Sequence, residues 1–414
     1  MNLSRIEQTL LEINRFGYSE QGMNRLAYTE SERQAIDFMI KLFEEEGMKV
    51  IIDPVGNVIA RREGTDPTLP AVVTGSHLDT VYNGGKYDGT LGVIAGLEVV
   101  RSLNEQNIET KHPIEIVIFA CEESARFGVS TIGSMAMIGE FKEELLHLED
   151  KDGISLRTAM ENCKLNIEQI EQAERKKEEI KVFYELHIEQ GPVLENEGKQ
   201  IGIVTGIAAP TRFHLEVVGE AAHSGTTPMP LRKDALLGAA EIALSLEQSA
   251  LKEVENDTVA TVGKCEVVSG SMNVIPEKVT MTIDIRSIHF KSKRKVVSEL
   301  YQIIELIEKK RDVKVSISQL CNDRPIKMND DIIHFLVQSC EKLNLSYRQM
   351  PSGAGHDAMM MAKRFPTGLI FVPSKNGISH NKEEFTSLEQ IGAGVSLLKE
   401  AILQAALVKT DALC

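Results

Sequence analysis

The sequence predicts an α/β protein in which a layered α/β domain is interrupted by a smaller α+β domain. At both ends of the chain, strand-like runs alternate with helical patterns, which is typical of layered α/β domains. The middle of the chain has the element order β-α-β-β-α-β, which is the split-βαβ or ferredoxin-like order. With 414 residues, the chain is long enough for two domains. We therefore expect one domain at residues 1–208 and 324–414, and an inserted domain at residues 209–323.

The first part of the chain contains most of the elements expected in the larger domain. Residues 29–32 have the pattern of a capping box, and the helix that follows has apolar residues at helical spacing until Gly47. Strands are expected at residues 49–52, 57–60, 71–74, 114–120 and 182–187, and a helix at residues 90–103. The run 114–120 is apolar on both faces, as in a sheet that is covered on both sides. The charged segment 150–179 is expected to form surface helices or an excursion.

The inserted domain begins where the pattern changes, near Arg212. Residues 213–218 alternate between apolar and polar side chains, as in a half-buried strand, and residues 231–246 form an amphipathic pattern. The remaining elements expected there are strands at 259–268, 278–286 and 313–317 and a helix at 292–310. After Pro325 the α/β pattern returns, with helices at 331–343 and 355–363, a strand at 367–372 and a last helix from Leu388.

Composition excludes several classes of function. The formal net charge of −15 argues against binding to nucleic acid or to anionic membranes. The start of the chain lacks the apolar core of a signal peptide, and no apolar run is long enough to span a bilayer. The cysteines are scattered without a C-x-x-C pair, which favours reduced thiols in the cytoplasm over a disulfide framework. They are Cys121, Cys163, Cys265, Cys321, Cys340 and Cys414.

A histidine and two aspartates follow the expected strand at 71–74. His77 and Asp79 come directly after this strand, and Asp88 follows a glycine-rich loop. Glycine allows the backbone to bend back sharply, so His77 and Asp88 can meet beyond the carboxyl end of the strand. Taken alone, the segment is equally compatible with a polar turn that holds an ordinary histidine.

Further imidazoles and carboxylates follow other expected strands of the same domain. Glu122 and Glu123 come after the strand at 114–120, and two adjacent carboxylates at a strand end need a compensating cation or exposure to water. His187 closes the run at 182–187, and His380 lies in a polar loop after the run at 367–372. Together these donors, without thiols, suit two divalent ions such as Zn, Mn, Co or Ni. An aspartate between two ions can bridge them, and a free glutamate beside them can serve a bound water.

Seven segments in the same order connect these residues to a known family. They are Gly75–Val81, Asn83–Gly89, Glu122–Phe127, His187–Gly191, His223–Met229, Ser352–Ala358 and Ser379–Asn381. With these segments, which span nearly the whole chain, the sequence resembles the M20-type dinuclear metallohydrolases. Within that family it is similar to the branch of N-carbamoyl-L-amino-acid hydrolases, allantoate amidohydrolases and metal-dependent β-ureidopropionases. The resemblance implies a catalytic domain that binds two metal ions and an inserted domain for lid movement and dimerisation.

The resemblance also implies roles for individual residues in the larger domain. The metal ligands would be His77, Asp88, Glu123, His187 and His380, with Asp88 as the bridging ligand. Glu122 would be the general base that takes a proton from the bridging water and returns it to the leaving nitrogen. Asp79 would hydrogen-bond His77 and fix its tautomer. Zinc is the first expectation for the metal, with manganese, cobalt or nickel as alternatives.

The inserted domain would supply the groups that bind substrate. His223 would stabilise the oxyanion in the active site of the partner subunit, and Asn273 and Arg286 would hold the carboxylate of the substrate. From the residues alone, the preferred interpretation is that His223 caps a turn and that Arg286 belongs to a surface ion pair. The other substrate contacts implied by the resemblance are Gln190, Arg212, Gly353, Ala354 and Gly355.

The expected reaction is hydrolysis of the carbamoyl C–N bond of an N-carbamoyl-L-amino acid, which yields the L-amino acid, ammonia and carbon dioxide. Closure between the two domains is expected to complete the site. A small ureido acid is the expected partner, with a homodimer formed through the inserted domain and no nucleic acid or membrane. The chain departs from relatives at Cys121, where they often have another acidic residue, and at Ser124, where they often have glycine.

Three other functions remain open at this point. An allantoate amidohydrolase would use the same chemistry, although residues 208–213 lack the Gln-Arg-rich segment that is common in such relatives. An aminopeptidase or deacylase of the wider family would not need Asn273 and Arg286 to hold a carboxylate. A non-catalytic relative would be expected to have lost metal ligands or the base, and the sequence retains all of them.

Overall fold

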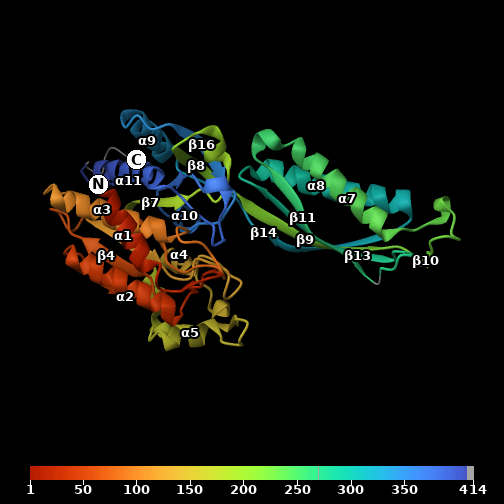
Figure 1. The fold of residues 1–414 in the computed structure, drawn as a ribbon, viewed down its shortest axis with the longest axis horizontal. Coiled ribbons are helices and arrows are strands. Elements are labelled where there is room, and N and C mark those ends of the chain that lie inside the picture. The colour runs from red at the N-terminus through yellow and green to blue at the C-terminus, as the bar shows by residue number, and fades with distance from the viewer. Residues whose placement is uncertain (269, 408–414) are drawn as a thin grey trace. The chain divides into compact units, whose positions relative to one another are not determined.

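The computed structural model describes residues 1–268 and 270–407, which form two compact units (Figure 1). Unit 1 contains residues 1–205, 328–350 and the described chain from residue 355 onward. Unit 2 contains residues 206–327 and also the short segment Pro351–Ala354. The inserted domain was expected at residues 209–323. Each unit has its own sheet and its own helices.

Unit 1 is organised around a nine-stranded mixed sheet in the order β15-β8-β17-β7-β5-β6-β4-β3, with β16 paired to β8. The four central strands β17, β7, β5 and β6 run parallel to one another, whereas β8 pairs antiparallel with β17, β4 with β6, and β3 with β4. The strands are β3 (Lys49–Ile52), β4 (Val58–Arg62), β5 (Ala71–His77), β6 (Ile114–Phe119), β7 (Ile180–Ile188), β8 (Ile201–Ile207), β15 (Ile326–Lys327), β16 (Tyr347–Ser352) and β17 (Thr367–Val372). The parallel centre is buried along its whole length, as the apolar run 114–120 predicts.

Helices pack on this sheet, and two of them, α3 (Thr90–Glu105) and α11 (Leu388–Leu407), lie against its central strands. Glycines allow α3 to approach closely, because a Cβ atom at Gly92 would lie 2.5 Å from the carbonyl oxygen of Leu186. The other helices of unit 1 are α1 (Leu3–Ile13), α2 (Glu30–Glu45), α4 (Ile132–Met137), α5 (Leu156–Asn162), α6 (Val193–Glu197), α9 (Asp330–Lys342) and α10 (Asp357–Met361).

The start of α2 differs from the expected capping box. The helix begins at Glu30, but the Thr29 hydroxyl donates to the carbonyl of Leu26 and does not cap the helix. The Glu32 carboxylate accepts a hydrogen bond from the backbone N–H of Tyr28, one residue before the expected donor. The predicted capping box is therefore wrong. Thr29 and Glu32 form hydrogen bonds with Leu26 and Tyr28 in the turn before α2, and not with each other's backbone.

The segment 150–179 contains α5 and the short 3-10 helices Ile167–Ala173 and Lys177–Glu179. It is not only a surface excursion, because several of its apolar side chains belong to a buried cluster that they share with other parts of unit 1. Leu156 and Met160 are fully buried in a cluster that also contains Tyr28 and Phe127. The cluster includes Cys121, the residue directly before Glu122.

Unit 2 has the expected β-α-β-β-α-β order. Its elements are β9 (Ala209–Val218), α7 (Ala235–Leu251), β11 (Val259–Val268), β13 (Lys278–Ser287), α8 (Phe290–Arg311) and β14 (Lys314–Asn322). The four strands form an antiparallel sheet in the order β11-β13-β9-β14. Every second residue of β9 and β13 is buried under α7 and α8, which leaves the polar residues between them on the opposite face. A small two-stranded antiparallel sheet, β10 (Ala222–His223) with β12 (Val274–Ile275), completes the unit.

Among the described residues, no helix combines the length and the apolar character needed to cross a membrane.

Arg25 is fully buried in unit 1 and contacts both ends of the loop that follows His77 and contains Asp88. Its guanidinium donates to the carbonyls of Leu78 at 2.6 Å and Ile13 at 3.2 Å, and to the hydroxyl of Thr90 at 2.7 Å. Burial lowers its pKa to about 10, although Glu32 and Asp79 oppose this effect.

We expect the substitution Arg25→Met to lower the free energy of unfolding by about 3 kcal/mol or more, because it leaves buried acceptors without donors. Urea unfolding followed by circular dichroism measures the effect. Arg33→Gln is the control, since Arg33 pairs with Asp37 on the surface of α2 at 3.3 Å. The control should change stability by less than about 0.5 kcal/mol. Equal unfolding midpoints for the two variants would contradict this role of Arg25.

Candidate metal centre

The ends of the parallel strands bring the candidate residues to one edge of the sheet in unit 1. His77 is the last residue of β5, and His187 lies near the end of β7. Glu122 and Glu123 follow β6, and His380 lies in the loop after β17. Because β17, β7, β5 and β6 are parallel, their carboxyl ends share this edge, where α/β sheets place ligand sites.

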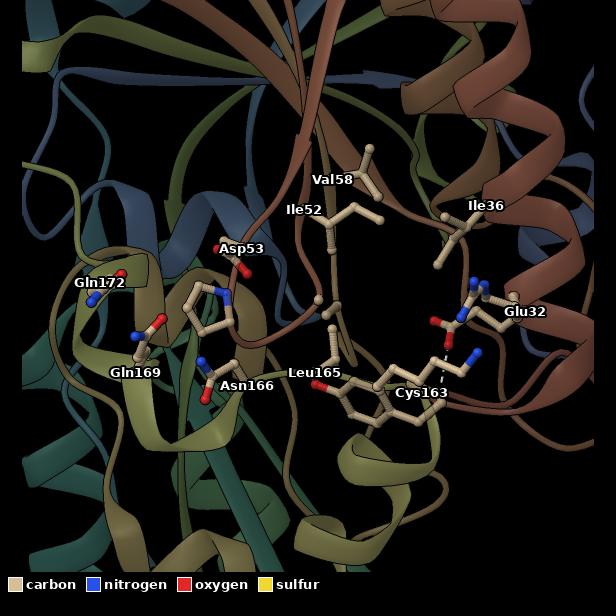
Figure 2. Close-up of a pocket in the computed structure, with 16 residues that line it drawn as sticks. Glu32, Ile36, Ile52, Asp53, Val58, Cys163, Leu165, Asn166, Gln169 and Gln172 are labelled. Atoms are coloured by element: carbon tan, nitrogen blue, oxygen red, sulfur yellow. Dashed lines mark hydrogen bonds between the residues drawn. The ribbon is translucent and has the colours of Figure 1, made fainter.

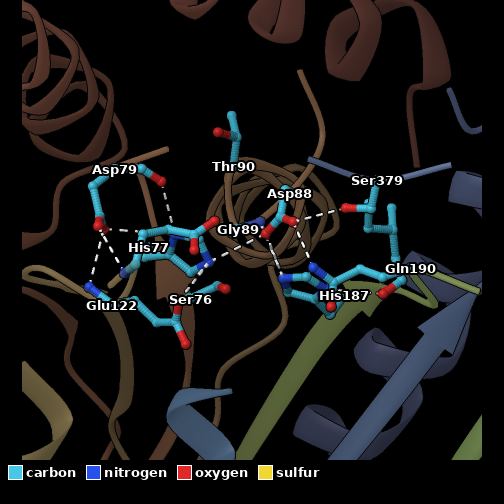
Figure 3. A network of polar contacts seen from close by, with 12 residues as sticks. Ser76, His77, Asp79, Asp88, Gly89, Thr90, Glu122, His187, Gln190 and Ser379 are labelled. Atoms are coloured by element: carbon cyan, nitrogen blue, oxygen red, sulfur yellow. Dashed lines mark hydrogen bonds and ion pairs between the residues drawn. The ribbon is translucent and has the colours of Figure 1, made fainter. Parts of the chain in front are cut away.

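The structure brings together two groups of side chains that could hold a metal ion, and the two groups share Asp88. The first donor group is His77, Asp88 and His187, in which the Nε2 atoms of the two histidines lie 3.4 and 3.1 Å from Asp88 Oδ1 (Figure 3). The second donor group is Asp88, Glu123 and His380, in which His380 Nε2 lies 3.3 Å from both Asp88 Oδ2 and Glu123 Oε1. Within each group, the ligand atoms lie within 4.8 Å of one another.

Backbone carbonyls fix the tautomers of the histidines in the first donor group. His77 Nδ1 lies 2.9 Å from the carbonyl oxygen of Asp79, and His187 Nδ1 lies 2.9 Å from that of Ile188. A carbonyl only accepts, so each Nδ1 must carry the proton of the neutral ring. The Nε2 lone pairs therefore face Asp88, which is the arrangement that a histidine ligand needs.

The site has an excess of buried acidic groups. They are Asp79, Asp88, Glu122, Glu123, Glu185, Asp357 and Glu384. Burial raises the pKa of Glu122 well above its usual range, opposed by His77 and assisted by Glu123 and Asp357. Burial also opposes ionisation of Asp88, but the neighbouring histidines hold the pKa of this group well below its usual range. Imidazole and carboxylate donors with surplus negative charge fit a divalent metal ion.

A third set of possible ligands, Glu185, His187 and His356, also meets at the site. The carboxylate of Glu185 already accepts hydrogen bonds from the Ser76 hydroxyl and the Ala358 backbone N–H, both at 2.8 Å. The rings of His187 and His356 pack edge to face with centroids 4.5 Å apart. Glu185 therefore holds neighbouring segments together, and His356 packs against the ring of His187. The geometry favours the first two donor groups as metal sites.

Asp79 makes a different contact from the one expected. The hydrogen bond to His77 comes from the Asp79 backbone carbonyl, whereas its carboxylate oxygen Oδ1 lies 3.6 Å from His77 Nδ1. The carboxylate accepts the backbone N–H groups of Glu122 at 3.2 Å and Glu123 at 2.9 Å. Asp79 thus holds the turn that carries the two glutamates.

Glu122 lies beside the donor groups without belonging to either of them. Its Oε2 atom is 3.6 Å from His77 Nε2, and its side chain is 8% exposed. Glu122 and Glu123 are adjacent in the chain, yet only Glu123 joins His380 and Asp88 in a donor group. A buried carboxylate in this position can exchange a proton with a group held at the site.

Asp88 is itself held by side chains that the sequence reasoning assigned elsewhere or missed. Gln190, expected in the substrate pocket, donates to Asp88 Oδ2 at 2.6 Å, and the Ser379 hydroxyl donates to the same atom at 3.1 Å. Glu384 accepts the backbone N–H of Asp88 at 3.1 Å, and burial beside Asp88 raises the pKa of Glu384 to about 7. No periodicity marks Glu384, which follows another glutamate in a polar loop. The only sign of Glu384 in the sequence was that it is a glutamate close to His380 along the chain.

Unit 2 brings His223 and Asn273 together through the antiparallel pairing of β10 with β12. His223 pairs with Val274, and the backbone N–H of Ser224 donates to the carbonyl of Asn273 at 3.0 Å. The backbone N–H of Gly225 donates to His223 Nδ1 at 3.0 Å, so the neutral ring carries its proton on Nε2. Both side chains are exposed in unit 2. His223 can therefore donate a hydrogen bond from Nε2.

The other residues expected to bind substrate are distributed over both units. Arg286 and Arg212 lie on adjacent strands of unit 2, and both contact Asp284, which the sequence reasoning did not single out. The carbonyl of Gly353 accepts from Arg286 Nη1 at 2.8 Å within the same unit. The Ala354 N–H lies 3.2 Å from the Ser352 hydroxyl, and Gly355 belongs to unit 1, where it precedes α10.

A separate cavity of about 490 Å³ lies elsewhere in unit 1, between α2, the β3–β4 hairpin and residues 163–172 (Figure 2). Its walls include the apolar side chains of Ile36, Ile52 and Leu165, with the carboxylates of Glu32 and Asp53. None of the members of the two donor groups lines this cavity. It is therefore not part of the candidate metal centre.

Comparisons with known proteins identify the family of the chain. The model of the family described as "Peptidase family M20/M25/M40" matches residues 73–404. An uncharacterized hydrolase of Haemophilus influenzae is 43% identical over 98% of this chain and 99% of its own length. The N-carbamoyl-L-amino acid amidohydrolase of Geobacillus stearothermophilus is 40% identical over 97% of this chain and 98% of its own. The allantoate amidohydrolase of Escherichia coli is 35% identical over 97% of both chains.

A solved structure extends the similarity to the whole fold. The amidase of the hydantoinase/carbamoylase family from Burkholderia multivorans superposes with a TM-score of 0.92 at 35% identity, over 98% of both chains. The predicted fold class, an α/β protein with an inserted smaller domain, is thereby confirmed. The chain belongs to the M20 family and, within it, to the amidohydrolases of the hydantoinase/carbamoylase branch.

Proposed function

We propose that this amidohydrolase cleaves the carbamoyl C–N bond of N-carbamoyl-L-amino acids, with the L-amino acid, ammonia and carbon dioxide as products. The observation that carries the proposal is the carboxylate of Asp88, which offers one oxygen to each donor group while Glu122 lies beside them. The 40% identity to a carbamoylase supports this choice of substrate.

We propose two divalent ions, zinc before manganese, cobalt or nickel, as the metals of the two donor groups. His77 and His187 would hold one ion, Glu123 and His380 the other, and Asp88 both. Bound there, such ions polarise a carbonyl group and lower the pKa of a water molecule toward neutrality. The proposed ions would also balance the buried carboxylates of the site.

The side chains of the protein would carry the protons and the charge of the reaction. Glu122 would take a proton from the attacking water and return it to the leaving nitrogen, because it is buried beside the donor groups but outside them. His223, protonated on Nε2, would donate to the oxyanion. Loss of one such donor lowers turnover by roughly 10²–10³ in other enzymes. Asn273 and Arg286 would hold the substrate carboxylate, since a guanidinium matches a carboxylate in a bidentate manner.

We also propose a homodimer formed through unit 2, which acts as a lid, and a location in the cytoplasm. The five described cysteines are all free, which suits a reducing compartment. The second candidate function is allantoate hydrolysis, which the 35% identity to an allantoate amidohydrolase favours. The donor groups are equally compatible with either substrate, so only a comparison of turnover on the two substrates can distinguish the two functions.

Assays of a substrate panel test the proposal, with release of ammonia measured for the ureido acids and release of the free amino acid measured for every substrate, because the N-acetyl and dipeptide controls yield no ammonia. The panel contains N-carbamoyl-L-amino acids of several sizes, their D-enantiomers, allantoate, and N-acetyl amino acid and dipeptide controls. Metal-stripped protein is assayed after addition of zinc, manganese, cobalt or nickel. We expect the N-carbamoyl-L-amino acids to be the best substrates. Faster turnover of allantoate would replace the first function by the second, and hydrolysis of dipeptides alone would contradict both. No turnover with any metal would indicate a non-catalytic relative.

We expect Glu122→Gln to retain its metal content but to lose nearly all turnover, by about 10³-fold or more, because the amide cannot accept the proton. Elemental analysis and the ammonia assay measure the two properties in the same sample. Glu383→Gln is the control, since Glu383 is an exposed acidic residue near His380. Full activity of Glu122→Gln would contradict its role as the base.

We expect Asp88→Asn to lower metal binding in both donor groups, because each group loses its aspartate oxygen. Glu123→Gln changes the second donor group only, so it should keep close to half of the metal content of the wild type. Equilibrium dialysis against buffered zinc, with elemental analysis, measures both stoichiometries. Equal metal content in Asp88→Asn and the wild type would show that Asp88 is not shared between two ions.

A further inference from the structure

We propose that Asp284 is a positioning residue that turns Arg286 so that the Nη1–Nη2 end of its guanidinium faces the substrate carboxylate. The inference rests on the proposed function, in which Arg286 binds that carboxylate. It deepens that function, because it states which edge of Arg286 is offered and how many carboxylates the clamp accepts.

The strand geometry places Asp284 next to Arg286. Both lie on β13 two residues apart, so their side chains share the polar face of the unit 2 sheet. Arg212 lies opposite Asp284 on β9 in the antiparallel register. All three side chains are partly exposed, with 29% for Asp284, 31% for Arg286 and 47% for Arg212.

Asp284 occupies one edge of the Arg286 guanidinium. Its Oδ1 and Oδ2 atoms lie 3.2 Å from Arg286 Nε, and Oδ2 lies 2.9 Å from Nη2. The carbonyl of Gly353 accepts one hydrogen bond from Nη1 at 2.8 Å. A guanidinium has five N–H donors. Among the described contacts, one N–H on Nη1 and one on Nη2 are still available. A carboxylate that binds Arg286 in a bidentate manner with Asp284 in place must therefore use the Nη1–Nη2 end.

The charges of this cluster also define the ligand. Arg212 Nε donates to Asp284 Oδ2 at 3.1 Å, so one carboxylate lies between two guanidinium groups. Partial burial opposes ionisation of Asp284, but Arg286 and Arg212 outweigh it and hold the pKa of Asp284 below its usual range. The three side chains carry a net charge of one positive unit. A single substrate carboxylate neutralises this charge, so the clamp suits monocarboxylic ureido acids better than dicarboxylic ones.

A different role for Asp284, in which it competes with the substrate carboxylate for Arg286, predicts the opposite change in substrate binding. If Asp284 only filled the place of the substrate carboxylate, its removal would free Arg286 and strengthen binding of the anion. If Asp284 positions Arg286, its removal leaves the guanidinium unoriented and weakens binding. The change in KM for a carboxylate substrate therefore distinguishes the two roles by its sign.

The kinetic test compares Asp284→Asn with the wild type on an N-carbamoyl-L-amino acid and on its uncharged carboxamide. We expect KM for the acid to rise about tenfold with kcat nearly unchanged, and kcat/KM for the carboxamide to stay within about twofold. Glu216→Gln is the matched control. Glu216 pairs with Lys278 at 2.9 Å across the same two strands, at similar exposure, but away from Arg286. The control should behave as the wild type. An unchanged or lower KM in Asp284→Asn would overturn the proposal.

A second measurement does not depend on turnover. In protein labelled with ¹⁵N-arginine, the Arg286 Nε–H resonance, assigned with Arg286→Lys, should exchange slowly with water. It should exchange faster in Asp284→Asn and remain slow in Glu216→Gln. Fast exchange in the wild type would overturn the geometry, whatever the substrate is. If the wild type hydrolyses no ureido acid while this resonance is protected, the proposed function fails and the contact between Asp284 and Arg286 stands.

Discussion

The carboxylate of Asp88 is the group on which the candidate metal centre depends. One of its oxygens faces His77 and His187, and the other belongs to the group with Glu123 and His380. A shift of the Asp88 side chain would therefore disrupt both donor groups at once. The protein fixes it from several sides, through the backbone contact to Glu384 and the hydrogen bonds from Gln190 and Ser379. Such support is what a site needs to hold its geometry while it binds ligands.

The backbone around Asp88 shows the cost of this arrangement. Gly89 has φ +63°, and a Cβ atom there would lie 2.4 Å from the His77 ring, so only glycine fits. Gln190 and His380 also have positive φ, at 59° and 54°, although neither is glycine. Residues in this region are uncommon and persist where their surroundings hold them. Gln190 and His380 are two such positions, and the side chains of both contact Asp88.

The sequence was sufficient for the layered fold and for the set of residues that converge, because both follow from simple rules. Donors that follow parallel strands meet at one sheet edge, which explains why His77, Glu123, His187 and His380 lie together. It was not sufficient for hydrogen bonds that depend on local rotation. Glu32 turned to Tyr28 instead of capping α2, and Asp79 used its carbonyl for His77 and its carboxylate for the glutamates. Asp284 and Glu384 were missed because their importance comes from contacts with Arg286 and Asp88, not from any pattern along the chain.

The order of the donors along the chain has a consequence for biosynthesis. His77, Asp88 and His187 all precede unit 2 in the sequence, whereas His380 follows it. The ribosome therefore makes every donor of the first group before it translates the inserted unit. The second group lacks His380 until nearly the whole chain has been synthesised. A nascent chain that stops within unit 2 contains every member of the first donor group but not of the second.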